Sequence, residues 1–473
     1  MEKIDFSNKF ANAEFALDYD SVLLKPGKAV IEPKDVDTTT NFSKSIKLSI
    51  PFVSSPMDSV TESRMAIAIA RRGGIGIIHR NCSADEELEM VKAVKRAESF
   101  IIRDVITISK NARVIDAFSI MKKHNISGLP VVENKKLIGI ITNRDVRDEE
   151  PSKSIEDVMT RELITATESI TEEEAVSIMK KNKIEKLPVV DGENNFKGLI
   201  TYKDVKIKGK YKNALRDEQG RLLVAAAISP FDIERAKILS KVADQLLIDV
   251  AHFHNINVIN ATKAIVKEIG KPVIIGNLGT KNGVLDAISM LDDGVAGLRV
   301  GLGSGSICIT SDVTRAGSPT LYAVSQAASA LKELDLKVPI IADGGMKNAG
   351  DAALAFAFGA DVAMFGYIFA ACEESPSPVL ELNGKQYKKH RGMGSKAARA
   401  RGAISDRYAD SGGKKIAEGI EILVPYKGKV DDIIDELTGE LRAAMGYAGK
   451  KTIEEMKDAE ILRINPRPKK IEY

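Results

Sequence analysis

Residues 294–310 of this 473-residue chain are GVAGLRVGLGSGSICIT, a short apolar run followed by a glycine-rich loop that carries Cys308. The run Gly294–Val300 is typical of a buried strand. A loop at the end of such a strand can hold a thiol in the open, close to backbone N–H groups that stabilise a thiolate. The loop by itself is equally typical of a cysteine that packs as a small apolar side chain. The rest of the chain favours the nucleophile.

Seven further apolar runs resemble this strand, and segments with helical periodicity lie between most of them, for example Glu62–Arg72 and Val258–Ile269. Apolar strands joined by helices predict a parallel sheet covered on both faces. Eight in series predict an α/β protein with a (β/α)8 TIM barrel. A doubly wound open sheet is the alternative, disfavoured because no Gly-x-Gly-x-x-Gly follows the first strand. The eight runs are Pro51–Met57, Gly73–His79, Leu222–Ile228, Gln245–Ala251, Pro272–Asn277, Gly294–Val300, Val338–Gly345 and Asp361–Gly366.

An internal repeat interrupts this series, because the pattern of Ile120–Asp145 recurs in Ile178–Asp204. Each copy predicts a helix, a strand, a turn, a second strand and the start of a helix. The repeat resembles a tandem pair of cystathionine-β-synthase (CBS) domains, including the Thr-x-x-Asp ends at Thr142–Asp145 and Thr201–Asp204. That resemblance implies an adenine or guanine nucleotide in the cleft between the copies. A structural insert with an empty cleft is the alternative.

We therefore expect three segments: a first part of the barrel at 1–100, the regulatory CBS pair at 101–207, and a second part of the barrel at 208–473. The last contains a polar, glycine-rich stretch at 388–428, which we expect to be a mobile flap.

Composition excludes several classes of protein. Lys and Arg number 69 and Asp and Glu number 66, a net charge of +3 that favours neither nucleic acid nor a membrane surface. No apolar run reaches the roughly 20 residues of a membrane span, and the first residues are not typical of a signal peptide. Three scattered cysteines fit a reducing compartment, so we expect a cytoplasmic protein without a metal–thiolate site.

Polar and glycine residues gather where the predicted strands end, which is where TIM barrels place their chemistry. Asp343-Gly344-Gly345 and Phe365-Gly366-Tyr367 end the seventh and eighth strands, the usual phosphate cradle of this fold. A phosphorylated substrate is therefore expected. Asp343 would repel a phosphate but can accept from two ribose hydroxyls. A carboxylate that only caps a turn is the alternative.

Nearly the whole chain resembles the inosine 5'-monophosphate (IMP) dehydrogenase / guanosine 5'-monophosphate (GMP) reductase family, and the dehydrogenase in particular. No single motif is specific to the family, but the motifs together are. The matching stretches are Leu17–Leu24, Ser55–Glu62, Gly73–Gly76, the inserted repeat, Gly276-Asn277, Gly301–Thr310, Ile341–Gly345, Arg391–Ser395 and Asp406–Tyr408.

The resemblance implies an NAD-dependent oxidoreductase of purine and GMP biosynthesis, the committed step of guanine nucleotide synthesis. Cys308 would attack C2 of IMP, hydride would pass to NAD, and water would hydrolyse the covalent thioimidate to xanthosine 5'-monophosphate. Arg407 and Tyr408 of the flap would activate that water, assisted by Thr310. Arginine is normally a poor base because its pKa exceeds about 12, so Arg407 would need burial and the phenol of Tyr408.

The resemblance also implies the binding residues, a potassium ion and a homotetramer. Residues toward NAD are Asp249, His252, Asn277, Arg299 and Gly301. The cation would be held by the carbonyls of Gly303, Gly305 and Cys308, since hard oxygen donors suit such ions. Residues that would hold IMP are Ser55, Met57, Ser306, Asp343, Gly345, Gly366, Met393, Gly394 and Glu418.

Several residues depart from the family pattern. Tyr367 stands where a phosphate-binding serine is common, and His390 where a tyrosine usually precedes Arg-Gly-Met-Gly. Val250, Phe253 and Thr320 are also unusual, and the tail 461–470 lacks the usual Glu-Gly-Gly element of the cation site. Two alternatives stay open: a GMP reductase that uses NADPH and releases ammonia, and a nucleotide-sensing paralogue with weak or no catalysis.

Overall fold

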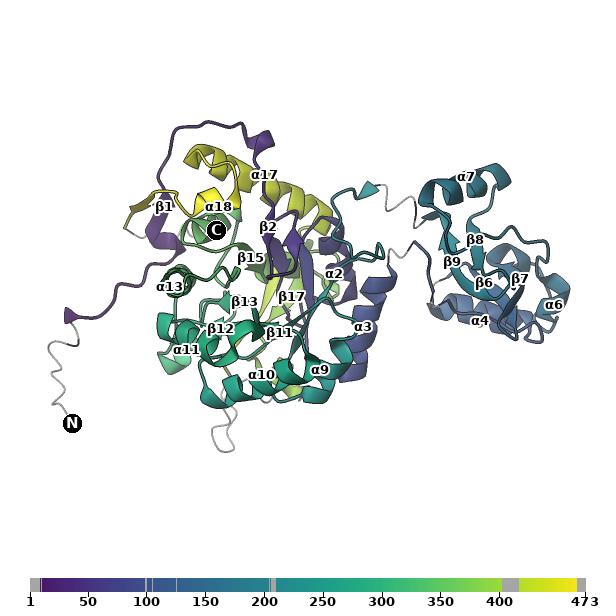
Figure 1. The fold of residues 1–473 in the computed structure, drawn as a ribbon, viewed down its shortest axis with the longest axis horizontal. Helices are drawn as coiled ribbons and strands as arrows, with labels where there is room; N and C mark the ends of the chain where they lie inside the picture. Colours follow the sequence, from purple (N-terminus) through teal and green to yellow (C-terminus); the bar gives the residue numbers. More distant parts are fainter. Residues whose placement is uncertain are drawn as a thin grey trace. The chain divides into compact units, whose positions relative to one another are not determined.

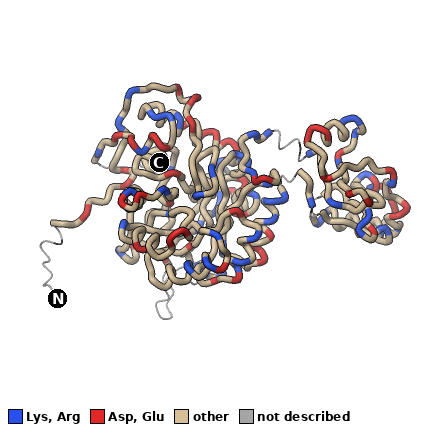
Figure 2. Tube along the Cα trace, viewed as in Figure 1, with Lys and Arg blue, Asp and Glu red and all other residues tan. Residues whose placement is uncertain are grey.

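The computed structural model describes residues 9, 11–97, 100–103, 105–124, 126–203, 205, 210–401 and 417–465. The chain forms two compact units, one of residues 1–94, 213–215 and 223–473, the other of residues 95–212 and 216–222. Basic and acidic residues are both spread over the two units (Figure 2). No helix among the described residues combines the length and hydropathy that a membrane span requires.

The first unit is a closed barrel of eight strands (Figure 1), which confirms the predicted TIM barrel. All eight neighbours pair in parallel, for example Ala225 with Gln245 and Leu298 with Ile340. Around the barrel the strands are β10 (Ala225–Ile228), β11 (Gln245–Ile248), β12 (Val273–Leu278), β13 (Val295–Val300), β14 (Ile340–Asp343), β15 (Val362–Phe365), β4 (Phe52–Ser54) and β5 (Ile75–Ile78).

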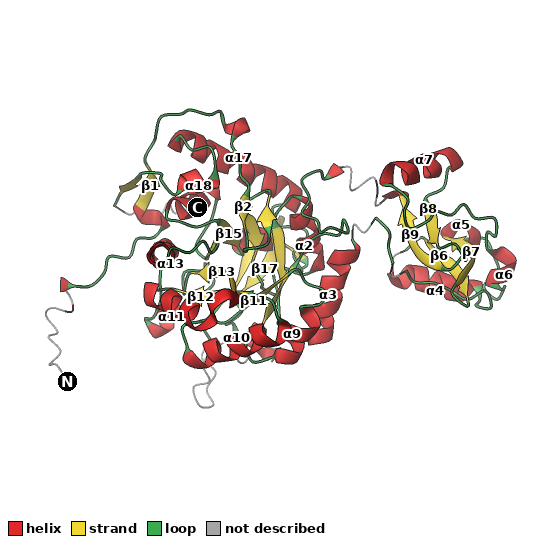
Figure 3. Cartoon of the chain, in the orientation of Figure 1, coloured by secondary structure: helices red, strands yellow, loops and turns green. Residues whose placement is uncertain are grey.

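Helices follow the strands and surround the barrel (Figure 3). Several begin at a polar side chain that accepts from the first backbone N–H groups, such as Asp232 before α9 and Asn255 before α10. These caps end their own strand-to-helix loops at a defined residue. The helices of this layer are α2 (Ser63–Arg71), α3 (Ala84–Arg96), α9 (Ile233–Leu239), α10 (Ile256–Ile269), α11 (Lys281–Leu291), α13 (Thr320–Glu333), α14 (Ala349–Ala357), α15 (Tyr367–Ala370), α17 (Val430–Ala448) and α18 (Ile453–Met456).

Side chains fill the barrel, so its interior is a core and not a pore. Val53, Ile77 and Leu247 belong to this buried cluster. The short hairpin of β2 (Thr40–Asn41) and β3 (Lys47–Leu48) adds Phe42, which is fully buried, and the Lys44 N–H donates to the carbonyl of Ala296. This hairpin therefore lies against the start of β13, opposite the strand ends that carry the glycine-rich loops.

Further strands lie outside the barrel. β16 (Val379–Leu382), β17 (Lys385–Arg391) and β18 (Glu421–Pro425) form a three-stranded antiparallel sheet, and β1 (Val22–Leu24) pairs with β19 (Ile461–Arg463). Within the expected flap at 388–428, Lys388 and His390 are buried residues of β17, and β18 begins at Glu421. Residues 402–416, with Arg407 and Tyr408, lie outside the described residues.

The second unit contains the sequence repeat. One copy has α4 (Val114–His124), β6 (Gly128–Glu133), β7 (Lys136–Thr142) and α5 (Asn143–Val146), with α6 (Ile155–Val158) behind it. The other has α7 (Glu172–Asn182), β8 (Lys186–Val190) and β9 (Phe196–Thr201). Each copy buries its own apolar cluster, and Lys186 of one donates to the Ser127 hydroxyl of the other at 2.8 Å.

Candidate active site

A cavity opens where the barrel strands end, as is usual for TIM barrels. About 930 Å³ of space free of protein atoms lies within it, including open solvent at its mouth. Its walls come from six strand ends and from the segments 390–394 and 418. The lining residues are Ser55, Met57, Ala251, Asn277, Arg299, Gly301, Leu302, Gly303, Ser304, Gly305, Ser306, Ile307, Cys308, Thr310, Asp343, Gly344, Gly345, Met346, Met364, Gly366, Tyr367, His390, Gly392, Met393, Gly394 and Glu418.

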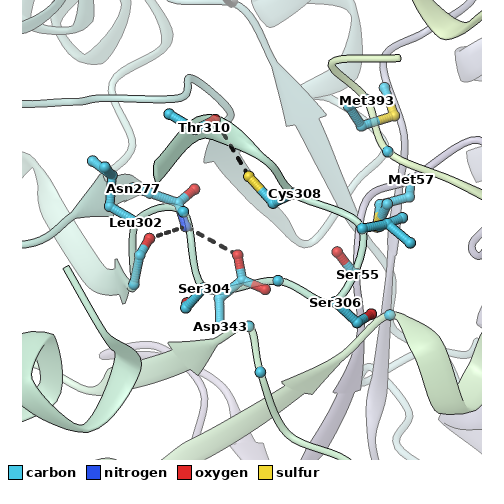
Figure 4. Close-up of a pocket in the computed structure, with 18 of the residues that line it drawn as sticks. Ser55, Met57, Asn277, Leu302, Ser304, Ser306, Cys308, Thr310, Asp343 and Met393 are labelled. Atoms are coloured by element: carbon cyan, nitrogen blue, oxygen red, sulfur yellow. Dashed lines mark hydrogen bonds between the residues drawn. The ribbon is translucent and has the colours of Figure 1, made fainter. Parts of the chain in front are cut away.

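Cys308 lies in this cavity, half-buried, in the loop after β13 (Figure 4). Its Sγ is 3.3 Å from Oγ1 of Thr310, the first residue of the short helix α12 (Thr310–Thr314). Thr310 Oγ1 in turn donates to Oε2 of Glu418 at 2.8 Å. Because the Thr310 hydroxyl has one proton and gives it to Glu418, its contact with Cys308 is one in which the thiol donates. These three groups form a chain along which a proton can leave the sulfur.

The segment 418–420 is held against the cysteine loop by backbone hydrogen bonds. The Ile309 N–H donates to the Glu418 carbonyl at 3.0 Å, and the Ile420 N–H donates to the Ile307 carbonyl at 3.1 Å. Gly419 fits tightly here, since a Cβ would lie 3.0 Å from the backbone nitrogen of Ser395. The Glu418 carboxylate is therefore positioned by main chain on both sides.

The other two cysteines have surroundings of a different kind. Burial raises the pKa of Cys82 to about 12, with the nearby Glu87 carboxylate adding to it. Burial also raises the pKa of Cys372 to about 12. Both remain thiols near neutral pH, and neither lines the cavity that holds Cys308.

A network of paired charges lies under the cavity floor. Asp343 accepts from Nδ2 of Asn277 at 2.9 Å and from Nε of Arg299 at 2.9 Å. The Arg299 guanidinium also donates to Oδ1 of Asp249 at 2.7 Å. Asp249 is fully buried, and the Arg80 guanidinium lies 3.6 Å from its other oxygen. Arg299 thus joins two carboxylates and holds the Asp343 side chain in one orientation.

Glycines bring the backbone close to the ligand space. Gly301 has a φ of +122°, and a Cβ there would lie 2.1 Å from the Asp343 carbonyl oxygen, so only glycine fits. Gly344 and Gly345 after β14 also have positive φ values, of +105° and +79°. These turns leave room for an anion near main-chain N–H groups, on the side where Gly366 and Tyr367 follow β15.

Tyr367 and His390 form another part of the cavity wall. Their rings meet edge to face with centroids 6.3 Å apart. His390 is buried, and burial lowers its pKa to about 4 although Asp58 acts in the other direction. Asp58 is itself paired with Arg391, at 2.8 Å and 2.6 Å. Burial alone would raise the pKa of Asp58, but the hydrogen bonds and charge of Arg391, with Asn81, outweigh it and lower that pKa.

The structure brings together most of the residues that the sequence predicted. All nine residues expected to hold IMP line the cavity, as do Cys308, Thr310, Asn277, Arg299, Gly301, Gly303 and Gly305. Two of those expected toward NAD do not. Asp249 is enclosed between Arg80 and Arg299, and His252 faces the ring of His254 at 6.2 Å.

Other lining residues were not among the predicted site residues. Ser304 shares a hydrogen bond of 2.7 Å with Thr320, and the ring of His390 enters from β17, a strand outside the barrel. Tyr367 and His390 are adjacent to recognised motifs, so their neighbours in the sequence were the available signal.

Comparison with known proteins gives one consistent family. Residues 16–468 match the model of the IMP dehydrogenase / GMP reductase domain. The chain is 53% identical over 445 residues to inosine-5'-monophosphate dehydrogenase of Korarchaeum cryptofilum, covering 94% of this chain and 93% of that protein. It is 46% identical to the enzyme of that name from Thermoplasma acidophilum, over 96% and 92% of the two chains. A crystal structure of a cysteine-to-alanine variant of Trypanosoma brucei GMP reductase with guanosine 5'-monophosphate is similar, with 36% identity, a TM-score of 0.88 and 97% coverage of both chains.

Proposed function

The chain belongs to the IMP dehydrogenase / GMP reductase family, and we propose that it oxidises IMP to xanthosine 5'-monophosphate with NAD and water. The observation that carries this proposal is the thiol of Cys308 in the cavity at the strand ends, joined through Thr310 to the Glu418 carboxylate. A thiol poised beside a proton acceptor is the arrangement that covalent catalysis requires.

Cys308 acts as the nucleophile. Its sulfur forms a bond to C2 of the purine, and the hydrogen on C2 leaves as hydride. NAD, when bound, supplies the two-electron acceptor for that hydride. A water molecule then adds to C2, the carbon–sulfur bond breaks, and the thiolate is regenerated. The sum is IMP, NAD and water giving xanthosine 5'-monophosphate, NADH and a proton.

The remaining wall residues hold the nucleotide. The Asp343 carboxylate, fixed by Arg299 and Asn277, accepts from the ribose hydroxyls. Ser306 and the backbones of Gly345 and Gly366 hold the phosphate. Ser55, Met57, Met393, Gly394 and Glu418 surround the base.

The residues present fit NAD on one side of the cavity. Oδ1 of Asn277 is buried there without a hydrogen-bond partner among the described residues, although both Nδ2 hydrogens are used. Such an acceptor suits a ligand N–H or O–H group. Asn277 would hold the cofactor together with Arg299 and Gly301. Asp249 would not touch the cofactor but would orient the Arg299 guanidinium through their hydrogen bond.

Activation of the water falls to Thr310 with Glu418, and to Arg407 and Tyr408 of the stretch at 402–416. The family pattern further implies a potassium ion on the carbonyls of Gly303, Gly305 and Cys308. Two of these carbonyls keep a lone pair beyond their hydrogen bonds, since Gly303 accepts from Ser311 and Gly305 from the Cys308 N–H. We also propose a homotetramer and an adenine or guanine nucleotide bound by the repeat as a tandem CBS pair.

GMP reductase is the second candidate, favoured by the structural likeness to the trypanosomal enzyme. The test is to mix the purified protein with IMP, NAD and potassium and to follow NADH absorbance. Steady NADH formation supports the dehydrogenase. Absence of NADH, with consumption of NADPH in the presence of GMP, would establish the reductase instead. If the protein catalyses neither reaction, a nucleotide-sensing protein is favoured.

A further inference from the structure

The imidazole of His390 is a polar group in the cavity wall to which the proposed chemistry gives no role. The side chain comes from β17 and is only 1% exposed, yet its ring lines the cavity. It faces Gly366 at the end of β15, since a Cβ on that glycine would lie 3.9 Å from both Cε1 and Nε2 of the ring. His390 therefore lies beside the strand end where TIM barrels hold phosphate.

The two ring nitrogens have different surroundings. Nδ1 lies 3.1 Å from the Ser59 hydroxyl oxygen, and this is the hydrogen bond that described residues make to the ring. Nε2 is the nitrogen on the side of Gly366. A ligand anion in the cavity can accept from Nε2 while Ser59 holds the ring in place.

Ser59 can serve the ring in either of two charge states. Its hydroxyl accepts from the Arg391 N–H at 3.2 Å and can donate to the Arg391 carbonyl at 3.3 Å. When the hydroxyl donates to Nδ1, the ring is neutral and carries its proton on Nε2. When it donates to the Arg391 carbonyl instead, Nδ1 can carry a proton and donate to Ser59. The ring can thus gain a proton after rotation of one hydroxyl, with no heavy atom moving.

The charged groups around His390 do not by themselves protonate the ring, so a bound ligand can decide its charge state. The Asp58 carboxylate acts to raise the pKa of His390. Its charge is paired with Arg391, which donates two hydrogen bonds to it, and Asn81 donates a third at 2.8 Å. Arg401 lies 4.0 Å from the same carboxylate, and Tyr367 meets the ring from α15. Without a ligand, burial keeps the ring neutral near physiological pH. A phosphate carries close to two negative charges at that pH and would favour the imidazolium.

We propose that His390 binds the 5'-phosphate of the nucleotide through Nε2–H and takes up one proton from solvent on Nδ1 as the nucleotide binds. The inference rests on the proposed function for the ligand class, a purine nucleoside 5'-monophosphate. It makes His390 a residue that matches its charge to the phosphate dianion, and Ser59 the positioning residue for that change.

Calorimetric titration of the full-length protein with IMP at about pH 7, in two buffers of different ionisation enthalpy, measures the protons exchanged on binding. Free IMP carries part of a proton at this pH, because the second phosphate pKa is about 6. A site that only selects the dianion would release that fraction. We expect net uptake by the wild-type protein, approaching one proton, and loss of that uptake in His390→Gln.

The matched control is Lys389→Gln on the same strand, whose side chain is exposed and which should keep the wild-type uptake. Ser59→Ala should reduce uptake with less loss of IMP affinity than His390→Gln. Proton release by the wild-type protein would overturn the inference even if the variants fail to fold, as would equal uptake in wild type and His390→Gln. If IMP and NAD give no NADH but GMP binds with the same uptake, the proposed function fails and this inference stands.

Discussion

Two walls of the cavity differ in how their charged and polar side chains are held. The barrel wall, made of Cys308, Asn277, Arg299 and Asp343, is fixed by paired charges, and Arg299 connects Asp343 to the fully buried Asp249. The outer wall, made of Gly366, Tyr367, His390 and Met393, has a neutral imidazole beside a hydroxyl that can turn. Fixed charge suits the ribose, because its orientation sets the position of the reacting base, and adjustable charge suits the anionic phosphate.

The largest expected effect lies on the barrel wall. Cys308→Ala should reduce turnover by about 10⁴-fold or more, because no other thiol of the described residues lines the cavity and the covalent step is lost. IMP binding should persist, since the ribose and phosphate contacts are untouched. Steady-state NADH assays and calorimetry with IMP measure the two quantities. Retained turnover would refute the covalent mechanism, and Cys82→Ala is the matched control.

A second change on the barrel wall weakens the fixed charge. Asp343→Asn should raise the KM for IMP by about 10- to 100-fold, because a charged acceptor of the ribose hydroxyls and the partner of Arg299 is lost. Asp335→Asn, at an exposed turn with positive φ that asparagine tolerates, is the control. An unchanged KM would remove Asp343 from the ribose site.

Glu418 connects the two walls, since it belongs to the segment 418–420 outside the barrel strands and its carboxylate contacts Thr310. Glu418→Gln should lower kcat by about 10-fold or more, because the carboxylate that accepts the Thr310 proton becomes a weaker acceptor. The loss should be greatest at low pH values of the assay, where fewer thiols ionise unaided. Glu421→Gln on β18, exposed and outside the cavity, should leave kcat unchanged. Equal losses in both variants would contradict the proton path.

The last expected effect concerns stability and the outer wall, and leaves activity near neutral pH out of account. His390 has a pKa of about 4 in the fold against an ordinary 6.5, so between these values the unfolded chain binds a proton that the native ring does not. Stability therefore rises with pH across that window, by up to about 3 kcal/mol from this residue. His390→Gln should flatten the pH dependence of the unfolding free energy between about pH 4 and 6.5. Parallel curves for both proteins would contradict the buried, neutral ring.

The same contrast explains what the sequence could predict. Eight apolar runs, with segments of helical periodicity between most of them, predicted the barrel because strand and helix patterns are local. Cys308, Asp343 and Asn277 could be placed in one site because parallel strands bring their ends to one edge.

The outer wall could not be predicted in the same way. His390 reaches the cavity only because β17 pairs with β18, from about 30 residues further along the chain, and because Ser59 meets its ring from the loop after β4. The pattern of 388–391 is polar, and the buried positions of Lys388 and His390 follow from partners distant in sequence. Asp249 was assigned to the cofactor for a related reason, because its enclosure depends on Arg80, which follows β5, two strands away from β11 in the barrel and 169 residues away in the sequence.

We propose that Cys308 carries the substrate during oxidation of IMP, and rapid acid quenching followed by mass spectrometry of peptides tests this step most directly. With IMP and NAD together, the peptide that contains Cys308 should carry the mass of the nucleotide, and with IMP alone it should not. NADH formation without any adduct on that peptide, or an adduct on the Cys82 or Cys372 peptide instead, would contradict the account.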